Sequence, residues 1–451
     1  MKLKHLPLVF LPLLAHADES ATKPSLNKEL LTGKIWERSL ADIKAAYEPK
    51  KGEDEDNDEI PEEVITRLTT EGVTIVRRSG SNKKFEWLSS QKKGLRAAGK
   101  SFTLLGKEIG EINIRSNEET ANMVDVSVYN RGDDGNIKKD EYLATLQEWK
   151  GLIDDHLGVR PRQRDKSGVV DTTGWIWQKD GSAYLLEGSL TRKSNRAEFI
   201  RLRIAPQNTS GRTKKLARRS TLDDHVKENE AGDVIIQGIP MVDQGQKGYC
   251  VVASIERVGR YYGLSVDQHE MAQVADTTED GTSSEVMEQA FKKITGKIHV
   301  RTIKLMDYDY RQTEKDYKAY DREAKKQGAK VFNIDLDTHY VIAQGFWQQA
   351  DKEVFKTVKA KQTKYTFFQS KVKEFIDQGI PICWTLYLGM FPEKEGQQQW
   401  GGHMRIIHGY NEKTQEIFYT DSWGAGHELK KMPAIHAWCM TTGLYAMVPN
   451  N

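Results

Sequence analysis

Apolar and polar residues alternate along several stretches of the first half of the chain. Residues 123–129 read Met-Val-Asp-Val-Ser-Val-Tyr, which places the valines on one face of a predicted strand. Residues 175–177 and 184–186 are apolar runs with an Asp-Gly pair between them. An Asp-Gly turn between such runs is typical of a β-hairpin. Residues 199–204 predict a further strand.

A helix is predicted over residues 140–157, between these strands. Its apolar side chains recur at the spacing of one helix face: Tyr142, Leu146, Trp149 and Ile153. Several strands and one long helix predict an α+β domain built on antiparallel sheet, and we place it at residues 18–205.

The second half of the chain begins with helical patterns and ends with strands. Apolar residues recur at helical spacing after Cys250 and again over residues 368–376. Residues 382–388 and 401–421 then predict antiparallel strands. Helices followed by antiparallel sheet predict a second α+β domain, over residues 235–451, with a cleft between a helical lobe and a sheet lobe.

Two segments are expected to lie outside these domains. Residues 1–17 carry two lysines, an apolar run and an Ala-His-Ala site, in the order of a secretory signal peptide. This order predicts a secreted or periplasmic protein. Residues 206–234 are rich in Gly, Ser and charge and predict a basic flexible linker. We expect trypsin to cut there first, between Arg212 and Arg219.

Composition narrows the classes of function. The chain has 451 residues, and its 67 Lys and Arg against 65 Asp and Glu give a net charge of +2. This balance provides no global field that would favour nucleic acid. The apolar runs are far shorter than the ~20 residues that cross a bilayer, so no membrane span is expected. Three cysteines are too few for a disulfide scaffold or a four-cysteine zinc site.

Residues 130–141 resemble a calcium-binding loop in part. Gly135, Ile137 and Glu141 fall at the sixth, eighth and twelfth places of an EF-hand loop. However, Asn130 and a glycine stand at the first and third places, where carboxylates are needed, and a strand precedes the loop. We interpret the segment as a strand-to-helix turn, and we expect neither a metal nor an organic cofactor.

The second half also carries a candidate nucleophile. Cys250 follows a segment with a Gln and two glycines, and stands in the first turn of a predicted helix. There the helix dipole favours a thiolate, and free backbone N–H groups can stabilise an oxyanion. Gln244 could supply a second donor to that oxyanion. The alternative is a buried structural cysteine, but such a cysteine needs no flexible approach segment.

A nucleophilic thiolate needs a base and an orienting group, and both are expected from the strands near the C-terminus. Residues 401–421 predict a strand, a turn centred on Glu412 and a second strand. This register would place His403 directly opposite Asp421, with Cβ atoms ~5 Å apart. His408 has the opposite parity, and we interpret it as structural.

Three stretches of this half resemble those of papain-like cysteine peptidases. Residues 244–250 read Gln-Gly-Gln-Lys-Gly-Tyr-Cys and are similar to the family's Gln-Gly-x-Cys-Gly-x-Cys stretch. Gly402-His403 resembles its histidine strand. Asp421-Ser-Trp-Gly is similar to its Asn-Ser-Trp-Gly stretch. The three matches occur in the family's chain order, which makes the resemblance specific.

The resemblance implies a role for each matching residue. Four of them would form the catalytic set: nucleophile Cys250, base His403, orienting residue Asp421 and oxyanion donor Gln244. Trp423 would cover the His–Asp pair. Trp423, Gly248 and Gly402 would border the bound substrate.

The sequence also departs from the family pattern. Lys247 stands where the family has a disulfide cysteine, and Asp421 stands where papain itself has Asn. An Asp at this position is similar to the bacterial branch of double-glycine leader peptidases, which process bacteriocins. The resemblance covers residues 235–450 and does not extend to residues 18–205.

We therefore predict a secreted cysteine peptidase that hydrolyses amide bonds of a peptide or protein through an acyl-enzyme. A transglutaminase-like acyltransferase would use the same three residues and pass the acyl group to an amine. A catalytically silent binding module would keep only the fold, and the intact catalytic set argues against it. The sequence indicates neither the substrate nor the oligomeric state.

Two further alternatives stay open at the level of sequence. Residues 18–205 could restrain the peptidase, bind a substrate or surface, or serve the structure. Cys383 and Cys439 lie in apolar stretches and could form a disulfide in an oxidising compartment, or could be independent buried thiols.

Overall fold

The structure is a computed structural model of the chain. It describes residues 23–48, 85–116, 119–165, 169–192, 194–207, 217–277, 284–298, 300–336, 339, 341–393 and 398–450. The predicted signal peptide, residues 1–17, lies outside these residues. Among the described residues no helix has the length and apolar content to cross a membrane.

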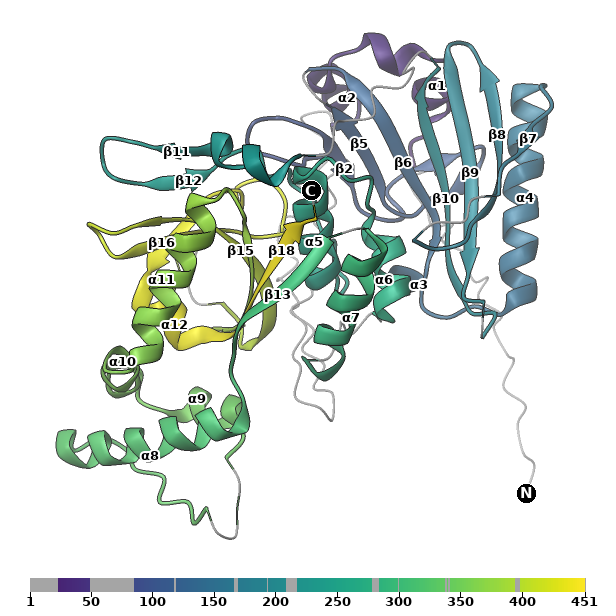
Figure 1. The fold of residues 1–451 in the computed structure, drawn as a ribbon. Helices are drawn as coiled ribbons and strands as arrows, with labels where there is room; N and C mark the ends of the chain where they lie inside the picture. The colour runs from purple at the N-terminus through teal and green to yellow at the C-terminus, as the bar shows by residue number, and fades with distance from the viewer. Residues whose placement is uncertain are drawn as a thin grey trace, which may run out of the picture.

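The N-terminal domain is built on an eight-stranded antiparallel sheet, shown at the right of Figure 1. Its strand order is β1-β2-β5-β6-β10-β9-β8-β7. The strands are β1 (Glu86–Trp87), β2 (Leu95–Ala97), β5 (Ile112–Ser116), β6 (Ala121–Asn130), β7 (Arg162–Gln163), β8 (Thr173–Lys179), β9 (Ser182–Leu190) and β10 (Ala197–Pro206). The remaining elements are α1 (Asn27–Leu30), η1 (Lys34–Glu37), α2 (Leu40–Ala46), β3 (Thr103–Leu104), β4 (Lys107–Glu108), α3 (Arg131–Asp134) and α4 (Lys139–Leu157).

The predicted helix and hairpin of this domain are confirmed. Helix α4 buries the expected stripe, including Tyr142 and Trp149, against one face of the sheet. Strands β8 and β9 pair with Trp177 opposite Tyr184. The turn between them has positive φ at Asp180 (51°) and at Gly181 (72°). Both central residues of a type I′ turn require such angles.

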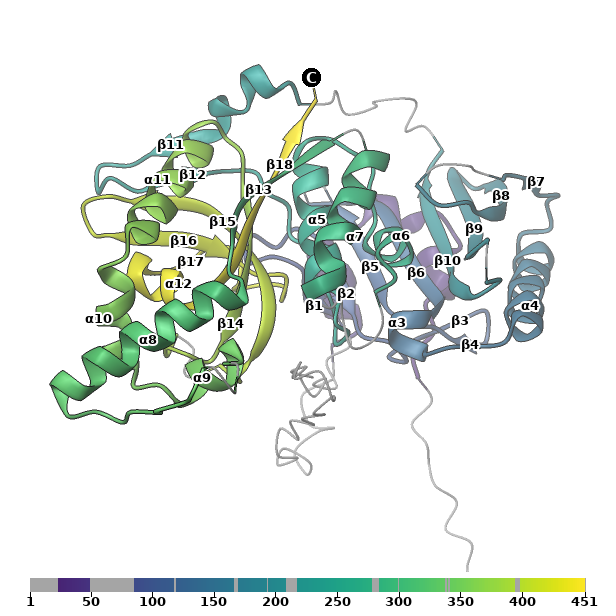
Figure 2. The ribbon, with the colours of Figure 1, turned by 60° about the horizontal axis from the view of Figure 1, so that its bottom comes forward.

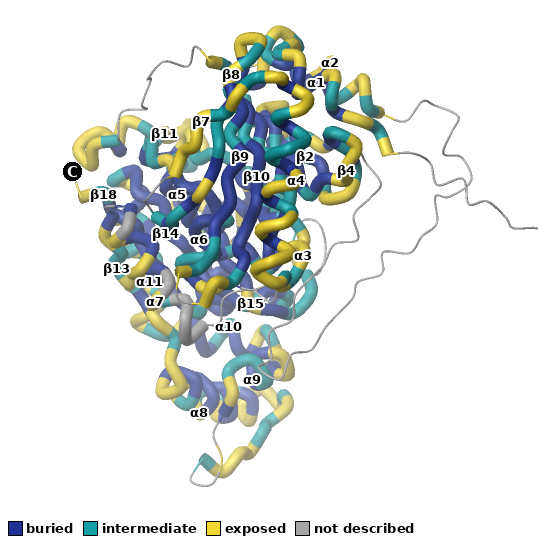
Figure 3. Tube along the Cα trace, turned by 90° about the vertical axis from the view of Figure 1, so that its right-hand side faces the viewer, coloured by how far each residue is buried: buried dark blue, intermediate teal, exposed yellow. Residues whose placement is uncertain are grey.

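Strand β10 divides its side chains between two different surroundings. Ile200, Leu202 and Ile204 are buried in the apolar core that α4 covers. Arg201 and Arg203 alternate with them, so their side chains point to the opposite face of the sheet. That face packs against the second domain, and Figure 3 shows the central strands buried along most of their length.

The C-terminal domain has a helical lobe and a sheet lobe. Its helices are η2 (Arg219–Thr221), η3 (Asp223–His225), α5 (Cys250–Tyr261), α6 (Gln268–Ala275), α7 (Ser284–Lys297), α8 (Tyr310–Gln327), α9 (Ala343–Gln349), α10 (Lys352–Ala360), α11 (Thr363–Asp377) and α12 (Ala434–Met440). Its strands are β11 (Val226–Glu228), β12 (Val234–Ile236), β13 (Val300–Asp307), β14 (Ile382–Leu388), β15 (Gly401–Asn411), β16 (Glu416–Thr420), β17 (Lys430–Pro433) and β18 (Thr441–Pro449).

The strands form one antiparallel sheet in the order β11-β12-β15-β14-β18-β13, and β16 and β17 continue from β15. Helices α5, α6 and α7 lie between this sheet and the N-terminal sheet, as Figures 1 and 2 both show. The chain thus has the α+β architecture that its patterns predict, with a helical lobe and an antiparallel sheet lobe in its second half.

The predicted linker is wrong over its second part. Residues 226–236 form the hairpin β11–β12, in which Val226 pairs with Ile236. Val234 and Ile235 then pair with β15, so this hairpin extends the C-terminal sheet. The basic and polar composition hid the strands because they are short and lie at the edge of the sheet. Residues 208–216, with Arg212, lie outside the described residues.

Candidate active site

Cys250 is the first residue of α5, as the sequence predicts. The helix is amphipathic in sequence but buried almost throughout, because it lies between the sheet lobe and the N-terminal domain. Cys250 itself is half-buried. Tyr249 occupies the N-cap position and makes no side-chain cap hydrogen bond. The first-turn N–H groups of α5 are therefore not capped by the side chain at the N-cap position.

His403 and Asp421 are in contact. His403 Nε2 lies 2.7 Å from Asp421 Oδ1, and both side chains are buried. Burial alone would lower the pKa of His403, but the charge of Asp421 outweighs it. Together with hydrogen bonds to Asp421 and Cys250, this charge raises the pKa of His403 to about 9. Because Nε2 faces Asp421, Nδ1 is the nitrogen that remains for the thiol of Cys250.

The register that places this pair differs from the predicted one. Strand β15 pairs with β16 as Ile406 opposite Thr420, and beyond a bulge as Gly409 opposite Phe418. Continued by one residue, this register puts Arg405 and not His403 opposite Asp421. On the other side of β15, His403 lies opposite Leu386 of β14. The bulge adds one residue at His408, which the sequence pattern did not reveal. The shift near His403 amounts to two residues, so His403 and Asp421 still share one face.

Sequence reasoning missed two charged residues that support Asp421. Arg405 Nε donates to Asp421 Oδ2 over 2.7 Å, and the Arg405 guanidinium forms a bidentate pair with Glu393 at 2.9 and 3.2 Å. Burial would raise the pKa of Asp421, but the charges of His403 and Arg405 hold it well below its usual range. Arg405 is two residues after His403, and this strand spacing was a signal for a shared face.

Arg257 is a third residue that the sequence analysis missed. It lies on α5, seven residues after Cys250, and its guanidinium donates to the backbone oxygen of Asp421 over 2.7 Å and to Thr420 Oγ1 over 2.6 Å. Burial lowers its pKa to about 10. Arg257 thus ties the helix of the nucleophile to the strand of the orienting carboxylate.

Trp423 covers the pair, as the resemblance implied. Its ring stacks on the imidazole of His403, with centroids 4.8 Å apart and an angle of 27° between the planes. The indole therefore covers one face of the His403 imidazole.

Gln244 connects the two loops of the site. Its backbone N–H donates to the backbone oxygen of Ser422, and its Oε1 accepts from Ser422 Oγ over 2.7 Å. Its Nε2 donates to the backbone oxygen of Lys247 over 3.2 Å. The amide is therefore held by neighbours of both Asp421 and Cys250.

The two predicted substrate-binding glycines flank the catalytic residues. Gly248 is half-buried on the segment before Cys250, and Gly402 is exposed on β15 beside His403. A Cβ at Gly402 would meet only the ring of Tyr387, at 3.9 Å. The strand therefore offers open backbone next to His403, and its use by a substrate stays a prediction.

The other two cysteines differ from Cys250. Cys383 and Cys439 are both free in the structure, so the disulfide considered above is not formed. Both are buried in the core, and burial raises the pKa of each thiol to about 12. They are thus unreactive thiols at neutral pH.

A cavity of about 950 Å³ lies between the two domains. Its lining includes Asp243, Arg257 and Thr420, but none of the residues Cys250, His403 and Asp421. The cavity belongs to the domain interface and not to the catalytic residues.

Residues 236–444 match the Peptidase_C39 like family. The resemblance to the leader-peptidase branch of papain-like peptidases is thus confirmed for the C-terminal domain. The match begins at the end of β12 and includes every residue assigned above to the candidate site. It does not extend to the N-terminal domain.

One solved structure is the peptidase domain of Streptococcus ComA, described as a bi-functional ABC transporter involved in a quorum sensing pathway. It is 12% identical, and the alignment covers 47% of this chain and 100% of that one with a TM-score of 0.24. At this score the likeness carries no argument. Comparison with curated proteins gave no match.

Proposed function

We propose that this protein is a cysteine peptidase in which Cys250 attacks the substrate carbonyl. The observation that carries the proposal is the contact of His403 Nε2 with Asp421 Oδ1 at 2.7 Å, on an imidazole whose pKa is raised by Asp421 and also by Cys250. A base held between a nucleophile and a carboxylate is the arrangement that activates thiols for acyl transfer. The match of residues 236–444 to a peptidase-like family supports the same conclusion.

The first half of the reaction forms an acyl-enzyme. With a pKa of about 9, His403 is protonated at neutral pH, which favours a thiolate–imidazolium pair with Cys250. The Cys250 sulfur attacks the carbonyl carbon, and the carbonyl oxygen becomes an oxyanion. First-turn N–H groups of α5 and Nε2 of Gln244 are its candidate donors. His403 then gives its proton to the leaving amine as the C–N bond breaks.

The second half consumes the acyl-enzyme. His403, now neutral, accepts a proton from water as the water oxygen attacks the thioester carbonyl. The C–S bond breaks, the acid leaves, and His403 and Cys250 return to the charged pair. Asp421 keeps Nε2 of the imidazole fixed in both halves. Residues 1–17 further support the proposal that the enzyme acts outside the cytoplasm.

Hydrolysis of a protein or a peptide mixture by the full chain tests the proposal. We expect new N-termini with the wild type and with Cys383→Ala, and none with Cys250→Ala. Cys383→Ala is the matched control, because it removes a buried thiol other than the candidate nucleophile. Hydrolysis by Cys250→Ala at the wild-type rate would refute the proposal. An added primary amine that replaces water as acceptor would instead indicate an acyltransferase.

A further inference from the structure

The segment before the nucleophile is anchored in the N-terminal domain. Lys247, three residues before Cys250, is buried, with 1% of its side chain exposed. Its Nζ lies 2.8 Å from Asp133 Oδ2 and 3.1 Å from Glu111 Oε2. Burial would lower the pKa of Lys247, but the charges of these two carboxylates raise it well above its usual value. Lys247 is therefore a charged side chain held across the domain boundary.

Tyr249 is held by the same domain. Its hydroxyl donates to Asn130 Oδ1 over 3.2 Å, and the Asn130 amide nitrogen lies 2.7 Å from His269 Nδ1. The Tyr249 ring also packs on the backbone of Gly132. A Cβ added at Gly132 would lie 2.5 Å from the Tyr249 oxygen and 2.6 Å from the ring carbon that carries it. Only a glycine fits between this short helix and the ring.

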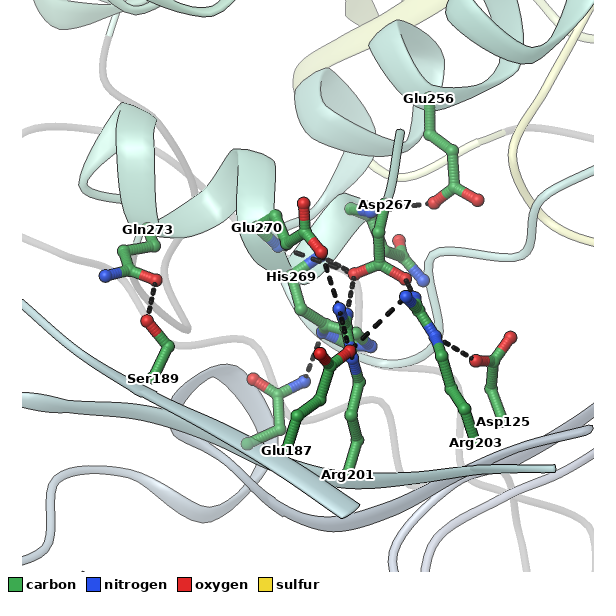
Figure 4. A network of polar contacts seen from close by, with 12 residues as sticks. Asp125, Glu187, Ser189, Arg201, Arg203, Glu256, Asp267, His269, Glu270 and Gln273 are labelled. Atoms are coloured by element: carbon green, nitrogen blue, oxygen red, sulfur yellow. Dashed lines mark hydrogen bonds and ion pairs between the residues drawn. The ribbon is translucent and has the colours of Figure 1, made fainter. Parts of the chain in front are cut away.

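Other contacts fix the two domains to each other. Arg201 of β10 pairs with Asp267 at 2.8 Å and with Glu270 at 2.5 Å, and Arg203 pairs with Asp267 at 2.9 Å. Figure 4 shows these arginines rising from the N-terminal sheet to the start of α6. Because these side chains are largely buried and paired, the interface holds the domains in one arrangement.

The loop after Trp423 touches the N-terminal domain as well. Ser90 Oγ donates to Glu428 Oε2 over 2.9 Å and accepts from the backbone N–H of Gly426 over 2.8 Å. The N-terminal domain therefore contacts the segment before Cys250 and the loop that follows the orienting Asp421.

We propose that the N-terminal domain is part of the catalytic apparatus and that Lys247 and Tyr249 are positioning residues for Cys250. This proposal rests on the proposed function. Glu111, Asp133, Asn130 and Gly132 hold the two side chains, and the chain between them fixes where α5 and its thiol begin. The backbone oxygen of Lys247 also receives the amide of Gln244, so the same contacts set the oxyanion donor. These contacts are made by Lys247 and Tyr249 and not by Cys250 itself. Both residues would therefore act on the thiol indirectly, through its position.

A pair of glycine substitutions in the N-terminal domain tests the proposal. Gly132→Ala would push the Tyr249 ring away, whereas Gly151→Ala on α4 is the matched control, because a Cβ there meets nothing within 4 Å. The readout is the rate at which iodoacetamide alkylates Cys250 in the native full chain between pH 5.5 and 9.

We expect Gly132→Ala to slow alkylation of Cys250 at pH 6 about tenfold, while Gly151→Ala leaves it unchanged. In Gly132→Ala, the pH profile of the alkylation rate should also approach that of an unassisted thiol, which ionises near pH ~8.5. A purely structural role of Gly132 would not change the shape of this profile. Equal rates and profiles in the two variants would overturn the proposal.

Two further outcomes are informative. If Gly132→Ala also exposes Cys383 and Cys439 to the reagent, the fold has loosened, and Asp133→Asn decides instead. Asp133→Asn removes one charge that faces Lys247, so we expect iodoacetamide to alkylate Cys250 more slowly in this variant. Alkylation at the wild-type rate would refute the positioning role of Lys247.

If the wild type itself has no thiol that reacts rapidly at pH 6, the proposed function fails. A fast wild type with an equally fast Gly132→Ala overturns the positioning proposal alone.

Discussion

Arg405 lies against Asp421 on the side away from His403, with Arg405 Nε 2.7 Å from Asp421 Oδ2 while His403 Nε2 contacts Oδ1. The orienting carboxylate is thus shared between an imidazole and a guanidinium. One partner fixes each oxygen, so Asp421 cannot rotate away from His403. The charge of Asp421, held in place by Arg405, raises the pKa of the His403 imidazole.

Substitution of Arg405 by Met should change the pH profile in a definite direction. Removal of a nearby positive charge favours the imidazolium form, so the pKa of His403 should rise. We expect the basic limb of the pH profile of kcat/KM to move to higher pH. The maximal rate should fall about tenfold, because Asp421 loses one of its two hydrogen-bond partners. The measurement is the pH dependence of kcat/KM. A basic limb at the wild-type position would contradict this role of Arg405.

Asp421→Asn should move the same limb in the opposite direction. The amide can still accept from His403, but it removes the charge that raises the pKa of the imidazole. We expect the basic limb to fall from about 9 towards the ordinary value of 6.5. Activity should stay above that of Asp421→Ala, which cannot orient the ring. Equal activities of the two variants would show that orientation by this residue is unimportant.

Stability should depend on the protonation of His403. Its pKa in the folded protein is about 9, above the ordinary value of 6.5. The imidazolium therefore stabilises the fold fully below pH 6.5, and this contribution is lost as the pH rises through 9. Its size is on the order of 3 kcal/mol. Urea unfolding at pH 6 and 9.5 should show a larger loss in the wild type than in His403→Gln. Equal losses of unfolding free energy in the two proteins would refute the raised pKa of His403.

The two domains should stay together after the chain between them is cut. From the sequence we expect trypsin to cut first between Arg212 and Arg219. Because buried ion pairs such as Arg201–Glu270 cross the interface, both fragments should elute as one complex, and alkylation of Cys250 should persist. Size-exclusion chromatography of the cut protein checks this. A C-terminal fragment that separates and gains activity would instead indicate that the N-terminal domain restrains the enzyme.

The elements of the catalytic pair could largely be predicted from the sequence. Apolar periodicity placed Cys250 at the start of a helix and His403 and Asp421 on neighbouring strands of one hairpin. The bulge at His408 could not be foreseen, because it depends on the pairing of β15 with its neighbours. The predicted contact held only because the error in register was even.

The supporting charges were beyond sequence reasoning for a physical reason. Lys247 was only a departure from a family pattern until the structure brought Glu111 and Asp133 to it from another domain. Such pairs join residues more than 100 positions apart, and local periodicity contains no information on them. The arginines of β10 alternate with apolar residues, a pattern typical of a strand with one solvated face, so the sequence contained no sign that the second face is buried against another domain.

The catalytic residues should behave as one unit. Cys250→Ala and His403→Ala should each abolish hydrolysis, and the double variant should be no worse than either, because neither residue works without the other. The measurement is kcat/KM of the two single variants and the double variant on one substrate. Additive losses would indicate that the two side chains act independently.

The most direct measurement is alkylation of the native protein by iodoacetamide at pH 6, with the modified peptide identified by mass spectrometry. The account predicts rapid labelling of Cys250, none of Cys383 or Cys439, and loss of the rapid reaction in His403→Ala. If Cys250 reacts no faster than the same thiol in the denatured chain, or equally fast without His403, then it is not an activated nucleophile and the account is wrong.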